Sequence, residues 1–246
     1  MLLLDVGNTR IKWGRYQQRR ISTHAAVVHA DRSVAEVLTE SWRGMPPPER
    51  IVAANVAGAA VAETLNRYCQ THFKLLPEYV IPAAQACGIT NGYRNPAQLG
   101  ADRWAAVIGA YHRCGGPVCA IGCGTAITVD TVTQAGHYPG GLIAPGIGAM
   151  HAALAGATAA IANEKGGQVA LYGEDTRTAV TSGIAYAAAG LIERAVADIR
   201  AQHGAQTGVL LTGGDAGYLQ SVLHGHYILA PHLVLEGLAV WAEQRS

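Results

Sequence analysis

The sequence predicts an α/β protein built from two similar halves. Short apolar runs alternate with longer amphipathic stretches along the 246 residues, as in mixed α/β chains. An apolar strand that leads through Gly and Thr into a second strand occurs twice, in residues 5–12 and 122–130. Half of the residues are hydrophobic and few are aromatic, so small aliphatic side chains must form the core. The repeat predicts two halves facing each other across a cleft, each with one hairpin. A chance match of two glycine-turn hairpins is the alternative.

The composition argues against several kinds of partner. The formal net charge is +1 and no polybasic run occurs, so we expect no binding to nucleic acid or to a membrane surface. The five cysteines do not form two pairs with zinc spacing, and free thiols predict a cytoplasmic protein. The N-terminus lacks the pattern of a secretory signal. The apolar run 140–162 is broken by Pro145 and contains His151, so it is not expected to span a membrane.

The opening hairpin is the first candidate site. An apolar run beginning at Leu2 predicts a buried strand, and Gly7 with Asn8 predicts a tight turn that tolerates positive φ. Backbone N–H groups of such a turn, with the Thr9 hydroxyl, are suited to phosphate oxygens. Asp5, where the strand ends, is suited to Mg²⁺ held through water. An ordinary hairpin with a solvated aspartate is the alternative.

The rest of the first half is predicted to alternate strands with helices. Ser33 is expected to cap a helix, with Glu36 at the capping-box position. The predicted strands are 25–29, 51–56 and 74–76, and the predicted helices are 34–43 and 58–72. We expect a first domain over residues 1–115 and a second over residues 116–246.

A polar stretch over residues 91–104 is the second candidate site. Pro96 is expected to begin a short turn or helix that Gly100 interrupts, before a helix over residues 101–113. A loop dense in Tyr, Asn, Arg and Asp that opens a helix is suited to substrate contacts. A surface connection capped by Asp102 is the alternative.

The second half repeats the alternation of strands and helices. The predicted strands are 117–122, a partner ending near 130, a strand ending near 143, and 208–211, and the predicted helices are 148–154, 175–203, one after Asp215, and 231–241. The small residues of 182–190 permit close helix packing, within the domain or across a dimer interface. The loop 212–215 is a weak match to a purine- or ribose-side loop, because glycine lets the backbone approach a flat ring.

Five short motifs together resemble one known family. They are Asp5-x-Gly7-Asn8-Thr9-x-x-Lys12, Tyr93-x-Asn95-Pro96-x-x-Leu99-Gly100-Ala101-Asp102-Arg103, Gly124-Thr125, Gly140-Gly141-x-Ile143-x-Pro145-Gly146, and Asp175-Thr176 with Ser182-Gly183-Ile184. The set resembles type III pantothenate kinase, in the superfamily of acetate and sugar kinases, heat-shock chaperones and actin. The resemblance implies duplicated actin-like (ribonuclease H-like) domains with mixed sheets flanked by helices and a cleft between the halves. It also implies a cytoplasmic homodimer whose substrate site is partly built at the subunit interface.

The resemblance implies a chemistry as well as a fold. Members phosphorylate the primary hydroxyl of pantothenate with ATP, giving 4'-phosphopantothenate in the first step of coenzyme A synthesis. By its match, Asp102 is the general base, since a carboxylate within reach of the hydroxyl can orient it and take its proton. Arg103 is suited to the substrate carboxylate or a phosphate. Mg²⁺ would be held by Asp5 through water, and a monovalent cation, K⁺ or NH₄⁺, is implied as activator.

The remaining implied residues fall into two groups. The residues implied to bind ATP are Asp5, Val6, Gly7, Asn8, Thr9, Arg10, Ile11, Lys12 and Thr125. The residues implied to bind pantothenate are Tyr93, Gly100, Ala101, Asp102, Arg103 and Thr176.

One position departs from the family pattern. Gly122 stands where the family usually has an acid that helps to bind the monovalent cation, so the ligand of that cation is unknown. Asp130 is conceivable, without a geometric reason to prefer it. The change at Gly122 favours the alternative of a catalytically weakened nucleotide-binding accessory or regulatory protein. The presence of the base, both hairpins and the substrate loop favours the kinase. A kinase for another small hydroxyl substrate does not account for residues 93–103.

Overall fold

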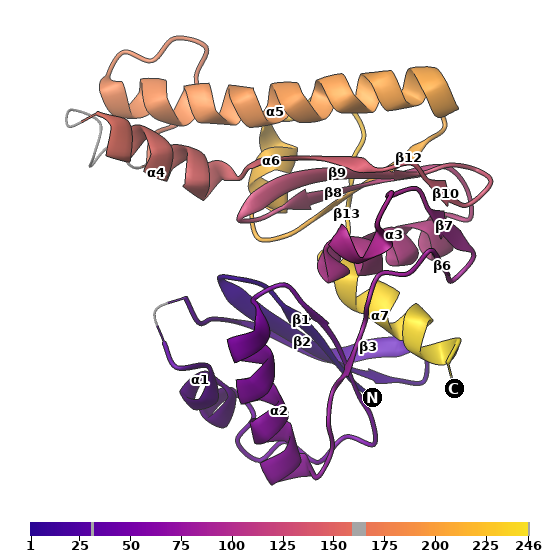
Figure 1. Cartoon of the computed structure of the whole chain (residues 1–246). Helices are drawn as coiled ribbons and strands as arrows, with labels where there is room; N and C mark the ends of the chain where they lie inside the picture. Colours follow the sequence, from indigo (N-terminus) through magenta and orange to yellow (C-terminus); the bar gives the residue numbers. More distant parts are fainter. Residues whose placement is uncertain (31, 159–165, 246) are drawn as a thin grey trace. The chain divides into compact units, whose positions relative to one another are not determined.

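The computed structural model describes residues 1–30, 32–158 and 166–245 (Figure 1). The chain forms two compact units, Met1–Arg113 with His232–Ser246, and Cys114–Pro231. The expected domain boundary, between residues 115 and 116, lies close to the point where the chain passes from the first unit to the second, between Arg113 and Cys114. The end of the chain differs from the expectation, because residues 232–246 were expected in the second domain and belong to the first unit.

The first unit is built on a five-stranded mixed sheet with the order β3-β2-β1-β4-β5. Its strands are β1 Leu2–Val6, β2 Arg10–Gln17, β3 Arg20–Val28, β4 Ile51–Asn55 and β5 Glu78–Tyr79. The pairs β1–β2 and β2–β3 are antiparallel, whereas β1–β4 and β4–β5 are parallel. The helices α1 Val34–Ser41 and α2 Ala59–Phe73 bury Leu38 and Leu65 against the side chains of β1 and β4. The hairpin β6 Gln85–Ala86 and β7 Ile89–Asn91 leads into the polar stretch, which contains the 3₁₀ turn η1 Pro96–Gln98.

Two helices of the first unit cross at a pair of glycines. In α3 Ala101–Cys114, a Cβ on Gly109 would lie 2.5 Å from the Leu233 carbonyl oxygen of α7 Leu233–Glu243. A Cβ on Gly237 of α7 would overlap the Ala105 carbonyl oxygen of α3. The backbones therefore touch directly. Helix α7 also packs on β1 and β4, which explains why the C-terminal residues belong to this unit.

The second unit repeats the sheet of the first. Its order is β11-β9-β8-β12-β13, with β8–β9 and β9–β11 antiparallel and β8–β12 and β12–β13 parallel. The strands are β8 Val118–Cys123, β9 Ala126–Val132, β11 Gly141–Pro145, β12 Gly208–Thr212 and β13 Ile228–Leu229, and the short β10 is His137–Tyr138. Each of the five strands of this sheet corresponds to a strand at the same position and in the same direction in the sheet of the first unit. The predicted duplication is confirmed.

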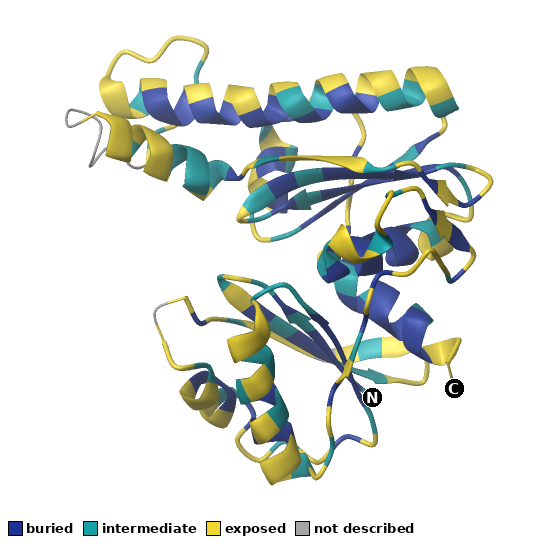
Figure 2. Cartoon of the chain, viewed as in Figure 1, coloured by how far each residue is buried: buried dark blue, intermediate teal, exposed yellow. Residues whose placement is uncertain are grey.

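The helices of the second unit differ in how many residues they bury. The long helix α5 Thr176–His203 and the short α6 Ala216–Val222 bury Ile192 and Leu219 in a core with Ile121 and Leu211. Figure 2 shows α5 as buried on one side and exposed on the other. Helix α4 Ile147–Ala157 packs beside α5 and has no buried residue among those described.

One predicted strand is absent, and two predicted elements form with a local geometry other than the one expected. Lys74 ends α2 with φ 59°, so the predicted strand 74–76 does not form and the short β5 follows instead. Ser33 is the N-cap of α1, but its side chain makes no capping hydrogen bond. Neither Gly7 nor Asn8 adopts positive φ. The other predicted helices and strands form, with ends shifted by a few residues.

Candidate active site

The first hairpin carries a buried carboxylate. Asp5 stands opposite Lys12 in the β1–β2 register, with Nζ of Lys12 4.0 Å from Oδ2 of Asp5. The Asp5 side chain is only 13% exposed. Burial raises the pKa of Asp5 to about 6, while the Lys12 ammonium lowers the pKa and the Asp102 carboxylate raises it. The carboxylate therefore lies where a bound cation would be stabilising.

The turn between β1 and β2 is formed by backbone groups. Gly7 N–H donates to the Arg10 carbonyl at 3.0 Å, and a Cβ on Gly7 would lie 3.3 Å from that same oxygen. Glycine is thus favoured at position 7 by close approach rather than by positive φ. The side chains of Val6 and Ile11 are buried in the core, so only their backbone can contribute to a phosphate site. His29, which the sequence analysis did not single out, contacts this turn from the end of β3.

The start of α3 presents the proposed base. Oδ1 of Asp102 accepts a hydrogen bond from the Arg103 N–H at 2.8 Å. A Cβ on Gly100 would lie 2.6 Å from that oxygen, so any other residue at position 100 would displace the Asp102 carboxylate. The first turn of a helix also stabilises a negative charge. The Asp102 carboxylate contributes to the raised pKa of Asp5, so the two carboxylates lie close enough to repel each other.

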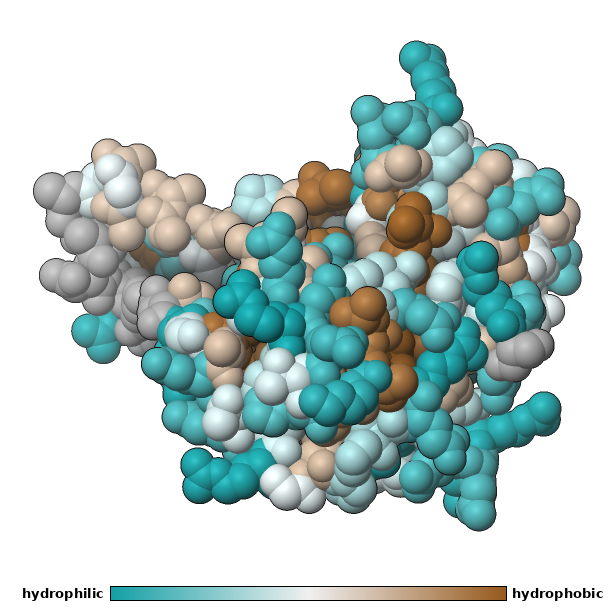
Figure 3. Space-filling model, turned by 60° about the horizontal axis from the view of Figure 1, so that its bottom comes forward, coloured by the Kyte–Doolittle hydropathy of each residue, from teal (hydrophilic) through white to brown (hydrophobic). Residues whose placement is uncertain are grey.

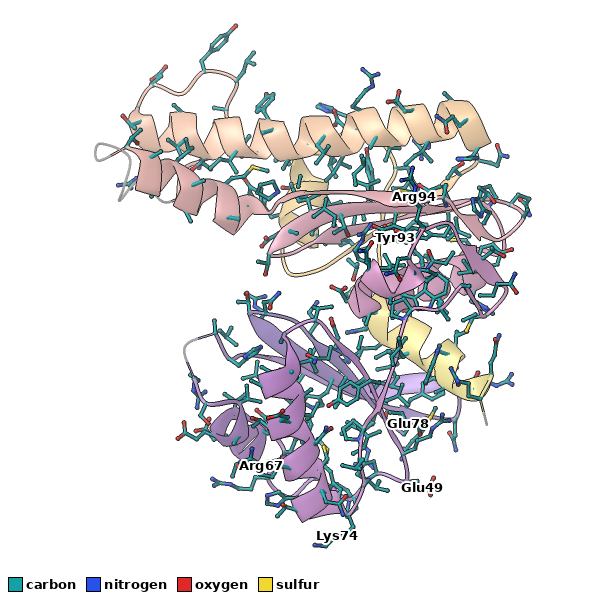
Figure 4. All side chains as sticks on the ribbon, viewed as in Figure 1. Glu49, Arg67, Lys74, Glu78, Tyr93 and Arg94 are labelled. Carbon is teal, nitrogen blue, oxygen red and sulfur yellow. The ribbon has the colours of Figure 1, made fainter. Side chains whose placement is uncertain are left out.

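Arg103 is held in a fixed orientation beside Asp102. It is 7% exposed, and its Nη1 donates to the Tyr93 hydroxyl at 3.0 Å. Its guanidinium carbon lies 5.9 Å from the centre of the Tyr93 ring. Tyr93 and Arg94, both labelled in Figure 4, lie on the connection that leads into α3, where Asn95 caps η1 by accepting from the Ala97 N–H. A guanidinium held in one orientation is suited to bidentate binding of a carboxylate or phosphate.

A cavity adjoins this helix start within the first unit. Its volume is about 400 Å³, and its wall includes Val56, Tyr79, Ile81 and the stretch 99–101. Most of these side chains are apolar, and the volume suits a small organic molecule. The cavity therefore offers room for a substrate next to Gly100 and Ala101, the two residues that precede Asp102 in the chain.

The second hairpin is enclosed by glycine-rich turns. A Cβ on Gly146 would overlap the Gly124 carbonyl oxygen, and a Cβ on Gly213 would overlap that of Cys123. Gly146 N–H donates to the Thr125 carbonyl and Asp215 N–H to the Cys123 carbonyl, each at 3.0 Å. The loop 212–215 thus meets the end of β8 through backbone alone. The structure places Thr125 on this hairpin, in the second unit.

The second hairpin does not fit a cation held by a carboxylate. Position 122 has no carboxylate, and a Cβ on Gly122 would lie 2.6 Å from Oγ1 of Thr128, so a larger residue there would require the Thr128 side chain to move. Asp130 is 2% exposed and accepts a hydrogen bond from the Tyr138 hydroxyl at 2.7 Å, a structural role. Among the residues that the structure describes, no three His, Cys, Asp or Glu side chains are grouped as metal ligands.

The motif at the start of α5 has a structural explanation in part. Asp175 is the N-cap of α5 and accepts from the Thr178 N–H at 2.8 Å and the Thr178 hydroxyl at 3.0 Å. These hydrogen bonds lower the pKa of Asp175. Thr176 is the exposed first residue of the helix. Figure 1 shows this end of α5 beside the end of α4, away from the sheet of the unit.

Structural comparison defines the class of the protein as an actin-like fold. MreB 5 of Spiroplasma citri, solved with AMPPNP bound, matches 99% of this chain and 96% of its own, with a TM-score of 0.55 and 10% identity. A Campylobacter jejuni protein assigned to a Baf family of transcriptional activators matches 100% of this chain and 98% of its own, with a TM-score of 0.63 and 18% identity. Identities this low show the fold alone, and they confirm the predicted fold class.

Sequence comparison identifies the family. A family model described as type III pantothenate kinase matches residues 1–198. A type III pantothenate kinase of Nitrosococcus oceani is 36% identical over 253 residues, covering 100% of this chain and 95% of the relative. One from Azoarcus sp. is 41% identical over 244 residues, covering 98% of this chain and 90% of the relative. The chain belongs to the type III pantothenate kinase family. Within the described residues, no helix is both long and apolar enough to cross a membrane.

Proposed function

We propose that this chain transfers the γ-phosphoryl group of ATP to the primary hydroxyl of pantothenate, giving 4'-phosphopantothenate in the cytoplasm. The observation that carries the proposal is the start of α3, where Gly100 and Ala101 of the family motif line a substrate-sized cavity and Asp102 and Arg103 follow directly in the helix. In this proposal Asp102 accepts the hydroxyl proton as the oxygen attacks the γ-phosphorus. Arg103, oriented by Tyr93, binds the pantothenate carboxylate.

The proposed nucleotide site uses the opening hairpin of the first unit. Backbone N–H groups of the turn between β1 and β2, with the Thr9 hydroxyl and Lys12, bind the phosphates, and the family motif assigns Thr125 to ATP as well. Asp5 holds Mg²⁺ through water, and its buried carboxylate supports this role. Mg²⁺, when bound, neutralises charge on the β- and γ-phosphates. These assignments rest on the family motifs and on the geometry of each hairpin.

The proposal is tested by ADP release with and without pantothenate. A pantothenate kinase is expected to release ADP only when pantothenate is present, in equal amount to the phosphopantothenate formed. ATPase activity independent of pantothenate, or no turnover with intact nucleotide binding, would favour the accessory or regulatory protein. The observation that favours this second candidate is Gly122, at the position where the family usually has an acid.

We propose a weak role for the monovalent cation. Position 122 has no carboxylate and Asp130 accepts a hydrogen bond from Tyr138, so in this proposal K⁺ or NH₄⁺ binds through backbone oxygens. We expect activity in K⁺ or NH₄⁺ to exceed activity in Na⁺ only modestly when the three salts are titrated at constant ionic strength. Loss of turnover in Na⁺ would contradict this and would indicate a specific cation site.

We also propose that the chain is a homodimer joined through the second unit. Ile143 and Leu142 of β11 are 64% and 48% exposed, and the apolar helix α4 buries none of its described residues. In Figure 3, pale brown residues gather beside the grey segment where α4 ends. On α5, Ala179, Gly183 and Ala187 are exposed at every fourth position, so another helix can approach closely. A second copy would cover this surface, and Thr176 would reach pantothenate across the interface.

Gly183→Arg is expected to separate the proposed dimer into subunits. Among the described residues outside the adjacent turns of α5, a Cβ on Gly183 would meet no atom within 4 Å, so a large side chain there is expected to disturb a neighbouring molecule rather than the fold. Light scattering should give twice 25.6 kDa for the wild type and 25.6 kDa for the variant. Gly217→Arg is the control, since Gly217 is also exposed on a helix with no atom within 4 Å. A dimeric Gly183→Arg protein would place the interface elsewhere.

A further inference from the structure

His29 binds both ends of the turn in the first hairpin. Its ring Nε2 lies 2.7 Å from the Gly7 carbonyl oxygen. Its backbone N–H donates to the Thr9 carbonyl oxygen at 3.0 Å. The residue is 6% exposed and follows directly on β3. A buried histidine thus bonds the Gly7–Asn8 and Thr9–Arg10 peptide units, which lie on either side of the Asn8–Thr9 peptide.

The hydrogen bond determines the state of the ring. A carbonyl oxygen only accepts hydrogen bonds, so Nε2 of His29 must carry the proton and donate. The imidazole therefore cannot act as an Nε2 base towards any group at this turn. Its chemistry here is to bind and orient a peptide unit.

Orienting that peptide decides which groups the turn presents. In a trans peptide the C=O and the following N–H point in opposite directions. The Gly7 carbonyl is turned towards His29, so the Asn8 N–H is directed to the opposite side. The Thr9 carbonyl is likewise turned towards His29, which directs the Arg10 N–H away from it. Carbonyl oxygens would repel a phosphate, whereas a set of N–H groups binds an anion.

We propose that His29 is a positioning residue for nucleotide phosphates, because its ring turns the Gly7 carbonyl away from the phosphate-binding side of the hairpin, while its backbone N–H does the same for the Thr9 carbonyl. This inference rests on the proposed assignment of that hairpin to ATP. His29 does not touch the nucleotide in this account. It acts through the peptide units that do.

Three substitutions at His29 separate orientation from packing. In Gln the amide nitrogen stands as many bonds from Cβ as Nε2 does in His, so His29→Gln can still donate to the Gly7 carbonyl. His29→Asn carries the same amide one methylene shorter and cannot reach it. His29→Leu fills the space without a donor and leaves a buried carbonyl unsatisfied. The Gln and Asn pair keeps the test valid even where Leu prevents folding.

The experiment measures binding of AMPPNP with Mg²⁺ to the full-length protein by calorimetry, alongside steady-state kinetics. We expect His29→Asn and His29→Leu to weaken AMPPNP binding by about tenfold or more, because each loses a buried hydrogen bond to the turn. The KM for ATP should rise likewise, while the KM for pantothenate stays within about twofold. His29→Gln should restore most of the affinity.

The matched control is His112→Leu. The ring Nε2 of His112 also bonds a backbone carbonyl, that of Cys87, at 3.0 Å, but its helix position is at the end of α3. This variant should lower the melting temperature without changing AMPPNP affinity. Nucleotide affinity within twofold of wild type in His29→Asn, or an equal loss in His112→Leu, would overturn the proposal. Wild-type protein that binds AMPPNP but does not phosphorylate pantothenate would instead refute the proposed function, and the His29 comparison would still be decided by binding.

Discussion

Asp102→Asn is expected to reduce kcat by about 10²–10⁴-fold, the usual contribution of a positioned general base. The amide keeps the shape of the side chain, and its oxygen can still accept the Arg103 N–H at the start of α3. It cannot take a proton from the pantothenate hydroxyl. The KM for ATP should therefore change little. Single-turnover kinetics with excess enzyme would measure the loss in the chemical step directly.

A matched control shows whether the loss is specific to Asp102. Asp198 is an exposed carboxylate paired with Arg194 on α5, and such surface pairs contribute little to stability. Asp198→Asn should leave kcat unchanged. Near-normal turnover in Asp102→Asn would remove Asp102 from the role of base and leave it as a residue that orients substrate.

Gly237→Ala is expected to lower the free energy of unfolding by about 1–3 kcal/mol or to prevent folding, the usual cost of forcing a methyl group into a filled space. The new Cβ would overlap the Ala105 carbonyl oxygen, and it would lie 3.0 Å from the Gly109 backbone nitrogen. Neither neighbour is a flexible side chain, so α7 must move away from α3. Urea denaturation followed by circular dichroism would measure the change.

The control for Gly237 is the same substitution in open space. A Cβ on Gly217, which is exposed in α6, would meet no atom within 4 Å, so Gly217→Ala should be neutral or slightly stabilising. Gly237→Ala with wild-type stability would mean that α3 and α7 do not cross in contact. Because α3 carries Asp102 at its start, activity should also fall in the variant that loosens this crossing.

Much of the local structure followed from the sequence. The apolar run before Asp5 and the Gly-Asn turn predicted the first hairpin, and the second Gly-Thr turn predicted the duplication. Within each hairpin the signals lie only a few residues apart, so the local sequence pattern is sufficient to predict each hairpin. The predictions that failed were also local, but were decided by backbone geometry: Lys74 entered the left-handed region to end α2, and the Ser33 side chain did not cap α1.

Some residues of the candidate site were indicated by the sequence, and others were found only in the structure. The resemblance to the family motif indicated Asp102, Arg103 and Tyr93, and the structure joins Arg103 to Tyr93 by a hydrogen bond. The roles of Thr125 and Thr176, in the second unit, stay predictions. His29 could not have been found by spacing, since a single histidine after a strand matches no ligand pattern and its carbonyl partners lie in another strand connection.

The sequence by itself determined the order of strands and helices, the repeat, and the family, because each depends on residues close together in the chain or on a motif read in order. Tertiary structure alone decided that α7 returns to the first unit, that Gly109 and Gly237 meet, and that Asp5 and Asp102 share one electrostatic environment. Those facts depend on pairs of residues far apart in sequence. Their closeness follows from packing and burial, which no local pattern encodes.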